Sequence, residues 1–573
     1  MLTACSGDDD TDAGSSAEST DETDTDDTTT TPEDSGSEES VSEPTTPATD
    51  PPTTETSVDD NGDGSDTGGT LVVAISADPG QFNPAITTSG SVHTGSELLY
   101  NGLVSYDENA APQPDLALSW EIEEDGALYR FQLRDDVVWH DGTPFTSADV
   151  KFTFENVLTE FHSRTAASVG AVLESVDTPD DSTVEFRFTE PYAPLLQQLD
   201  VTEAPIIARH LYEGSDPVEN PVNLQPIGTG PFMFQSYSPD EEVVFVKNPD
   251  YFESGLPKLD EVVMRVIPDA GSQVIALEAG EVDWLWGVPG PELERLSADD
   301  AYETMQTLVN PGGANCIMTV SFNLDRPMFQ DQRVRQALAH GLDRQAFLDR
   351  AAFGQGNIAT APISSGIPSA YADGLDMPAY DLDEAARLLD EAGWARDGDG
   401  TRTAQGVDGV EDGTPLSFGV HVYPTFSTYG ELMKALLLDL GVEVEVNALE
   451  PPTLIDEVFT QRAFDTNIIS YCNGTDPEVG VRRMYISSNI APIPFSNSSG
   501  YVNEDVDALF DEARNTVDPD ARADVYRELQ EILVAELPYF WLVESLSTRI
   551  HTNECTGFVP FGHFAEAATC QRE

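Results

Sequence analysis

The stretch that decides the fold begins with Leu416-Ser417-Phe418-Gly419-Val420-His421-Val422, which predicts a strand. It is followed by a predicted helix over 428–440, a strand over 442–447, a helix over 453–460 and a strand over 464–470. Strands and helices that alternate in this order are typical of β-α-β units. The second half of the chain is therefore predicted to be an α/β lobe.

Helix signals surround this core. Residues 331–351 predict one helix that runs from Asp331 towards Gly354. A further helix starts at Asp381, where Glu384 has the spacing of a capping box, and it ends at Gly393. Its apolar residues fall three and four positions apart, which indicates one buried face: Ala385, Leu388, Leu389 and Ala392. Asp518-Pro519 predicts the start of another helix, because proline is favoured at the first helical position.

The first half is richer in strands. The apolar run Leu71–Ile75 follows Gly68-Gly69 and predicts a buried strand, and 95–103 predicts a helix. Residues 128–133 and 183–188 alternate with period two, as half-buried strands do. Between them Thr146 to Asp149 predicts a helix start with hydroxyl capping groups and an acid in its first turn. Further strands are expected near 242–247, 261–267 and 317–322, and the region 106–219 is predicted to be β-rich.

Composition excludes several classes of protein. The chain has 573 residues, with 27 Lys and Arg against 104 Asp and Glu, and a formal net charge of −77. So acidic a surface repels phosphate backbones and anionic headgroups, which argues against nucleic-acid binding. No stretch approaches the ~18 consecutive apolar residues of a membrane-spanning helix. With 39% hydrophobic and 9% aromatic residues, the chain as a whole is not disordered.

The N-terminal region differs from the rest. Residues 6–70 consist largely of Asp, Glu, Ser, Thr, Pro and Gly and cannot bury enough apolar surface to offset chain entropy, so we expect a disordered acidic linker. Just before it, Leu2-Thr3-Ala4-Cys5 resembles a bacterial lipobox, in which the cysteine is lipidated. Residues 1–5 are then a lipobox remnant and Cys5 a lipid anchor. The alternative is an incidental cysteine, since the basic and apolar parts of a signal peptide are missing.

The four other cysteines are even in number, which in an exported chain suggests two disulfides. Proximity favours a bond between Cys555 and Cys570 and leaves Cys316 with Cys472. Free buried thiols are the alternative. No Cys or His spacing indicates zinc, and we predict neither a metal site nor a cofactor.

Four stretches of the sequence form one set of motifs. They are Tyr129–Arg134 with Val138–Val150 (including Trp139-His140-Asp141-Gly142), Ile227–Phe232, Phe322–Leu324 with Asp331–Leu338 and Asp343-Arg344, and Ala385–Trp394 with Asp397–Gly400. Together they resemble the extracellular solute-binding proteins of ABC importers, family 5, which includes dipeptide, oligopeptide and nickel binders. Their order and spacing match that family over residues 70–573.

The resemblance implies an α/β, two-lobed fold of the periplasmic-binding-protein type (type II, cluster C). Lobe I would comprise 71–105, 220–318 and 537–573, with a β-rich subdomain over 106–219, and lobe II would comprise 319–536. A monomer on the extracellular face of the bacterial cytoplasmic membrane would trap a peptide or related small organic solute between hinged lobes. It would then deliver the solute to permease subunits, without catalysis.

By the same resemblance, ligand contacts are expected from four segments. These are the loop after the first strand, the segment 284–286, the loop near 421–428 and the segment after the strand 464–470. Aromatic walls give large and nearly non-specific contact with varied side chains, although core packing explains such residues equally well. The candidates are Gln81, Phe82, Asn83, Trp284, Trp286, Tyr423, Phe426, Tyr471, Asn473 and Asp476.

The expected ionic contacts depart from those of dipeptide binders in this family. Those proteins hold the ligand's ammonium with an Asp where this chain has Asn473, and its carboxylate with an Arg where this chain has Phe426-Ser427-Thr428. An amide supplies no full charge to hold an ammonium. Asp476 could replace the missing carboxylate only if its loop shifts. We therefore expect a longer peptide bound through its backbone, or a neutral or cationic small molecule, rather than a free zwitterionic dipeptide.

Three alternatives remain open. His421 lies near the expected cleft and could ligate a nickel chelate. A surface solute receptor or adhesion module could use the same fold without transport. An extracellular hydrolase is disfavoured, because the chain has no Gly-x-Ser-x-Gly elbow, no His-Glu-x-x-His and no phosphate loop.

Overall fold

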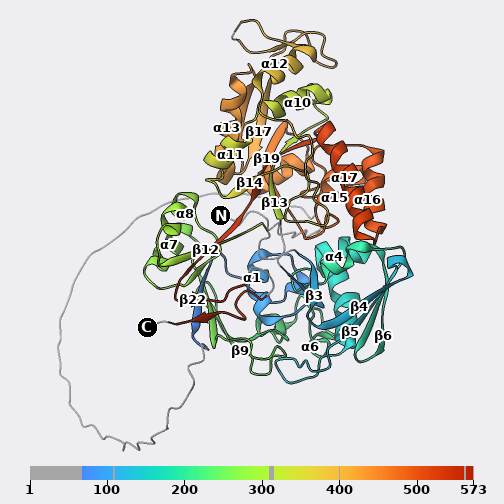
Figure 1. Cartoon of the computed structure of the whole chain (residues 1–573), viewed down its shortest axis with the longest axis vertical. Coiled ribbons are helices and arrows are strands. Elements are labelled where there is room, and N and C mark those ends of the chain that lie inside the picture. Colours follow the sequence, from blue (N-terminus) through green and yellow to red (C-terminus); the bar gives the residue numbers. More distant parts are fainter. Residues whose placement is uncertain (1–67, 108–109, 309–314, 399, 560–562, 572–573) are drawn as a thin grey trace, which may run out of the picture. The chain divides into compact units, whose positions relative to one another are not determined.

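The computed structural model describes residues 68–107, 110–308, 315–398, 400–559 and 563–571. Cys5 and most of the predicted linker lie outside these residues. Three larger sheets organise the described part of the chain, one in each lobe and one in a β-rich subdomain (Figure 1). Within the described ranges, no helix is both long enough and apolar enough to cross a bilayer.

The lobe I sheet has seven strands in the order β12-β21-β11-β1-β10-β9-β8. Its central strand β1 is apolar throughout because both of its faces are covered: Leu71 and Val73 belong to one core cluster, Val72 and Ala74 to another. The strands are β1 (Thr70–Ile75), β8 (Phe232–Ser238), β9 (Glu242–Lys247), β10 (Glu261–Val266), β11 (Trp284–Leu285), β12 (Tyr302–Thr307) and β21 (Ser547–Thr552). The helices are α1 (Gly90–Leu99), α7 (Ala270–Glu278) and α8 (Gly290–Ser297), with the short helices η1 (Pro84–Ile86) and η5 (Pro221–Leu224).

The β-rich subdomain contains a four-stranded antiparallel sheet in the order β4-β5-β7-β6. Thr146 and Asp149 form a reciprocal capping box at the start of α2, as the sequence predicts. The strands are β2 (Val104–Tyr106), β3 (Pro112–Pro114), β4 (Ala117–Glu123), β5 (Leu128–Leu133), β6 (Leu173–Asp180) and β7 (Thr183–Phe188). The helices are α2 (Ser147–Thr153), α3 (Thr159–Phe161), α4 (Ser163–Ala167), α5 (Val169–Val172) and α6 (Arg209–Tyr212), with η2 (Glu124–Gly126), η3 (Phe154–Leu158) and η4 (Ala193–Gln198).

The lobe II sheet has six strands in the order β14-β20-β13-β19-β17-β18. β17 runs parallel to β18 and β19, the arrangement that alternating strands and helices predict. The six strands are β13 (Asn315–Phe322), β14 (Gly356–Ile358), β17 (Ser417–Val422), β18 (Glu443–Ala448), β19 (Thr466–Asn473) and β20 (Tyr539–Ser545), and β15 (Trp394–Ala395) and β16 (Thr403–Ala404) form a separate two-stranded sheet. The helices are α9 (Pro327–Gln330), α10 (Gln332–His340), α11 (Arg344–Arg350), α12 (Leu382–Glu391), α13 (Ser427–Leu438), α14 (Pro451–Ile455), α15 (Val481–Tyr485), α16 (Glu504–Asn515) and α17 (Pro519–Glu536), with η6 (Pro424–Phe426), η7 (Asp456–Thr460) and η8 (Ser487–Asn489).

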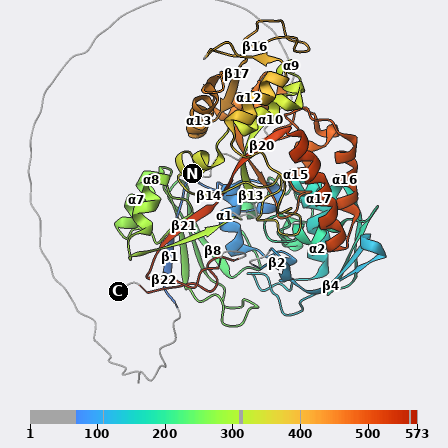
Figure 2. The ribbon, with the colours of Figure 1, turned by 45° about the horizontal axis from the view of Figure 1, so that its top comes forward.

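The chain passes between the two large sheets twice. β12 of lobe I precedes β13 of lobe II, and β20 of lobe II is separated from β21 of lobe I by Leu546 alone. Figure 2 shows β20 and β21 as consecutive strands. Strand pairing therefore puts 315–318 and 537–545 with lobe II, whereas the sequence boundaries had put them with lobe I.

Two helices differ from their predictions. The single helix expected over 331–351 is two helices, because Asp343 caps α11 by accepting hydrogen bonds from the Gln345 and Ala346 amides. The helix expected over 95–103 is α1, which ends at Leu99. The chain is already extended at Tyr100, and a Cβ on Gly102 would lie only 2.4 Å from the Leu199 carbonyl oxygen.

Two of the sequence motifs meet inside lobe I. His140 Nδ1 accepts a hydrogen bond from the Gly228 amide at 3.1 Å, and its Nε2 bonds to the Gly230 carbonyl at 3.0 Å. A Cβ on Gly228 would lie 1.7 Å from the Leu99 carbonyl oxygen, so only glycine fits there. The role of these motifs is thus structural.

Both expected disulfides are present. Cys555 and Cys570 close a short C-terminal loop between β22 (Cys555–Thr556) and β23 (Thr569–Cys570). Cys316 and Cys472 are directly paired residues of β13 and β19, with their Cα atoms 4.0 Å apart. The second bond therefore fastens the two central strands of lobe II to each other.

Candidate functional site

The segment that follows β19 carries a buried ion pair. The guanidinium of Arg522, on α17, contacts both carboxylate oxygens of Asp476, at 2.7 and 3.0 Å. Arg522 also donates to the Ala513 carbonyl and to the Tyr526 hydroxyl. Burial alone lowers the pKa of Arg522, but the Asp476 carboxylate together with Tyr526 and Glu478 outweighs that effect and raises the pKa. The carboxylate predicted as a stand-in for a ligand contact is therefore engaged by the protein itself.

Asn473 is the last residue of β19 and pairs directly with Asn315 of β13. Both side chains are buried, and the Oδ1 atom of each has no hydrogen-bond partner among the described residues. Paired residues of adjacent strands have their side chains on the same face of the sheet. The end of the two central strands thus holds two buried amide oxygens with unused hydrogen-bonding capacity, packed next to Gly366 and Gly480.

The aromatic candidates of lobe II are mostly parts of its core. Tyr471 is fully buried, its hydroxyl lies 3.0 Å from Ser498 Oγ, and burial raises its pKa. Tyr423 is 3% exposed, and its ring centroid lies 6.0 Å from that of the half-buried Phe426. Of these three rings, Phe426 offers the most accessible surface.

Trp284 and Trp286 differ in their surroundings. Trp284 on β11 is fully buried and stacks on His551, with ring centroids 5.5 Å apart. Trp286 is half-buried, and the Arg549 guanidinium lies 5.3 Å from its ring centroid. The Nε1 of Trp286 has no acceptor among the residues with described positions. Burial lowers the pKa of Arg549 to about 10, so this side chain is charged at neutral pH.

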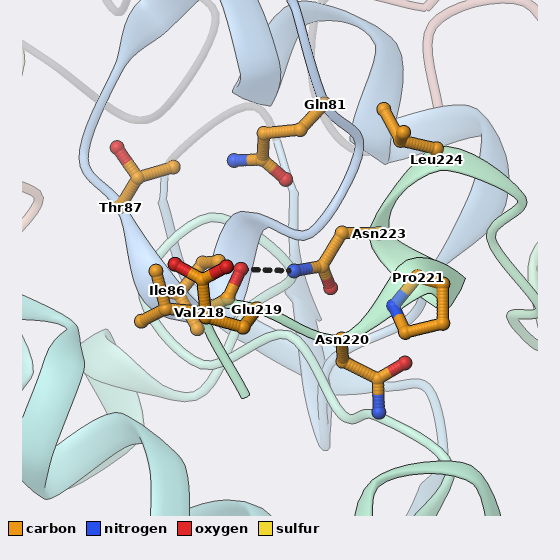
Figure 3. Close-up of a pocket in the computed structure, with 9 residues that line it drawn as sticks. All are labelled: Gln81, Ile86, Thr87, Val218, Glu219, Asn220, Pro221, Asn223 and Leu224. Carbon is orange, nitrogen blue, oxygen red and sulfur yellow. Dashed lines mark hydrogen bonds between the residues drawn. The ribbon is translucent and has the colours of Figure 1, made fainter. Parts of the chain in front are cut away.

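The loop after β1 presents only one of its three candidates to a pocket. Phe82 is buried against Phe234 and Tyr237, and Asn83 is buried as the cap of η1. Gln81 lines a pocket of about 400 Å³, shown in Figure 3. The other lining residues are Ile86, Thr87, Val218, Glu219, Asn220, Pro221, Asn223 and Leu224.

His421 has one acidic neighbour. Its Nε2 lies 2.8 Å from the Glu457 carboxylate, and the residue is 8% exposed. No group of three or more His, Cys, Asp or Glu residues that could hold a metal ion occurs among the residues that the structure describes. A bound nickel chelate would therefore have to bring most of its own ligands.

Sequence reasoning missed a set of charges where lobe II meets the β-rich subdomain. Arg514 on α16 forms a 2.7 Å ion pair with Glu190, and Thr475 donates to the Gln197 carbonyl at 2.9 Å. Nearby, the side chain of Glu478 is 9% exposed, and burial raises its pKa to about 7 despite the neighbouring Arg482. No local sequence pattern signals this set, since its members come from segments far apart in the chain.

Comparison with known proteins shows which protein family has this sequence and architecture. The model of bacterial extracellular solute-binding proteins, family 5, matches residues 111–491. This chain belongs to that family. It is 27% identical over 489 residues to the oligopeptide-binding protein AppA of Bacillus subtilis, which covers 83% of this chain and 86% of AppA. It is also 27% identical to the heme-binding protein A of Haemophilus influenzae, over 87% of this chain and 91% of the relative.

Solved structures agree with this assignment. NikA of Brucella suis in complex with Fe(III)-EDTA superposes with a TM-score of 0.76 at 25% identity, over 88% of this chain and all of NikA. As a family 5 solute-binding protein, the chain is the substrate-binding component of an ABC importer. Because these relatives are named for an oligopeptide, a heme and a metal chelate, the ligand of this family 5 protein has to be argued from its own residues.

Proposed function

We propose that this protein captures a peptide or related small organic solute whose polar ends are bound by neutral groups, and releases it unaltered to a membrane permease. The observation that carries the proposal is the Asp476–Arg522 pair. Because that carboxylate is buried and bound at two points by a guanidinium, it has no charge to offer a ligand ammonium. The acceptors left at the end of β13 and β19 are the amide oxygens of Asn315 and Asn473.

Amide acceptors suit backbone N–H groups or a neutral donor better than a full ammonium, whose buried charge needs a counter-charge. Trp286 and Phe426 supply half-buried aromatic surface for varied side chains. A longer peptide held through its backbone, or a neutral small molecule, fits this set, whereas a cationic molecule would need a counter-charge other than Asp476. A free zwitterionic dipeptide does not.

Capture would proceed by hinge closure. The lobes are connected at β20–β21, where Leu546 alone separates the two strands, and this short connection suits a bending motion. A ligand shifts the population towards the closed state only through differential affinity, which contact with both lobes provides. Lipidation at Cys5, with residues 6–70 as a tether, would hold the protein near its permease at high effective concentration.

The test is native mass spectrometry of the purified protein, followed by calorimetric titration with what co-purifies and with free dipeptides. The expected result is a bound solute that is recovered chemically unchanged, and no tight binding of free dipeptides. Asn473→Asp should introduce dipeptide affinity, whereas the matched change Asn447→Asp on β18 should not. Tight binding of several free dipeptides by the unaltered protein would overturn the proposal.

A further inference from the structure

The pocket beside Gln81 is made by lobe I alone. One wall is the segment from Gln81 to Thr87, and the other is the segment from Val218 to Leu224 (Figure 3). Since lobe II contributes no lining residue, the pocket does not depend on whether the lobes are open or closed. A ligand here need not be the one trapped between the lobes.

Hydrogen bonds within lobe I fix the polar wall of this pocket. Asn223 donates to the Pro217 and Val218 carbonyls, and its Oδ1 accepts from Asn83 and from the Tyr212 hydroxyl. Asn220 likewise donates to the Leu211 carbonyl and accepts from the Val222 amide. Both amides are therefore committed to shaping the wall and do not select a ligand.

Four of the other lining residues are aliphatic, beside the polar Gln81 and Thr87. Val218 and Leu224 are 49% and 50% exposed, and they line the pocket together with Ile86 and Pro221. Exposed aliphatic side chains gathered around a concave surface favour an apolar guest, because covering them removes apolar area from water.

One charged group stands among these aliphatic residues. Glu219 is exposed, and its carboxylate forms no ion pair with any Lys, Arg or His in the described ranges. Figure 3 draws its side chain next to Ile86 and Val218. A carboxylate beside aliphatic surface matches a cation at the end of an aliphatic stem, which buries its methylene groups and keeps its charged end at the rim.

We propose that this pocket is a second binding site, for an aliphatic ammonium such as a lysine side chain. Its volume of about 400 Å³ exceeds what one such side chain occupies. Ile86, Val218 and Leu224 cover the stem, and Glu219 pairs with the ammonium. The strongly acidic chain, at −77, concentrates cations near its surface and favours the encounter.

The experiment uses the full chain and two probes of equal stem length, Nα-acetyl-lysine N-methylamide and Nα-acetyl-norleucine N-methylamide. Saturation-transfer NMR and calorimetry should show that the lysine probe binds and that the norleucine probe binds more weakly. Glu219→Gln should raise the Kd of the lysine probe at least about threefold, the range of a partly exposed ion pair. Added salt should weaken binding, because it screens that pair.

Two controls separate this site from the cleft and from the general acidity of the surface. Glu174→Gln removes an exposed carboxylate of β6 outside the pocket and should leave the Kd unchanged. Asn473→Asp alters the proposed cleft and should also leave it unchanged, so the two proposals can fail separately. The second site is refuted if Glu219→Gln and Glu174→Gln have equal effects, or if both probes bind equally well to a protein whose circular dichroism shows it to be folded.

Discussion

Asp476 and Arg522 lie 46 positions apart in the sequence, yet their side chains meet in a two-point ion pair with no solvent exposure of the carboxylate. The pair joins the segment after β19 to α17. It thereby fixes the loop that follows Asn473, at the end of the strand where a ligand is expected.

Breaking this pair should destabilise the protein. Asp476→Asn leaves a buried guanidinium without its counter-charge, at a cost of about 3–5 kcal/mol in the free energy of unfolding. Urea denaturation followed by circular dichroism measures this cost. Glu384→Gln, which removes the exposed pair with Arg387 on α12, is the control and should have no measurable effect. Equal stability of Asp476→Asn and the unaltered protein would mean that the pair does not exist in solution.

The contribution of Glu478 to stability should fall as the pH rises towards 7. Burial raises the pKa of Glu478 to about 7, as it does for Asp115 and Glu566. A carboxyl whose pKa is raised on folding holds its proton more tightly in the folded state, so stability declines with pH between about 4.3, the unfolded value, and 7. Each group contributes a slope of at most about 1.4 kcal/mol per pH unit.

Denaturation midpoints measured from pH 5 to pH 8.5 test this dependence. Because glutamine cannot ionise, Glu478→Gln should lose less stability with rising pH than the unaltered protein does. Glu174→Gln, at an exposed site, should show the same dependence of the midpoint on pH as the unaltered protein. A stability difference between Glu478→Gln and the unaltered protein that stays constant from pH 5 to pH 8 would contradict this expectation.

Local sequence patterns predicted many of the strands and helices. The strands 128–133 and 183–188 have the predicted bounds, because alternation of apolar residues requires only that one face be buried, and the strand expected near 242–247 also has those bounds. The helix break at Asp343 was within reach of the same reasoning, since an aspartate after Gly341 is a helix-start signal. Its omission joined α10 and α11 into one predicted helix.

The site was less accessible to sequence reasoning. A tryptophan on a strand can face the core or a cleft, and the pattern Trp284-x-Trp286 could not show that His551, from β21, covers the first ring. The partner of Asp476 is Arg522, on a helix 46 positions further along the chain, and no sequence pattern next to either residue predicts the pairing. Such contacts depend on tertiary structure, which local periodicity does not reveal.

The two disulfides should differ in their effect on stability. The bond between Cys316 and Cys472 spans 156 residues, and that between Cys555 and Cys570 spans 15. In the chain-entropy account a longer loop loses more freedom in the unfolded state, which gives about 3 kcal/mol for the short loop and more than about 4.5 kcal/mol for the long one. Replacing each pair by serine and comparing the unfolding midpoints should place the Cys316–Cys472 variant lower. The reverse order would show that native-state effects dominate.

The contact between lobe II and the β-rich subdomain should affect ligand affinity but not the free energy of unfolding. Arg514 pairs with Glu190 across this contact, at 2.7 Å. The proposed hinge opening would break this pair, so Arg514→Ala should lower the closed population and raise the ligand Kd about two- to fivefold, the range of a partly exposed ion pair. Most of that change should appear in the dissociation rate, measured by stopped-flow fluorescence of the tryptophans. Arg387→Ala, on helix α12, is the matched control and should leave the ligand Kd and the dissociation rate unchanged. An Arg514→Ala variant with unaltered affinity and dissociation rate would show that this ion pair has no part in closure.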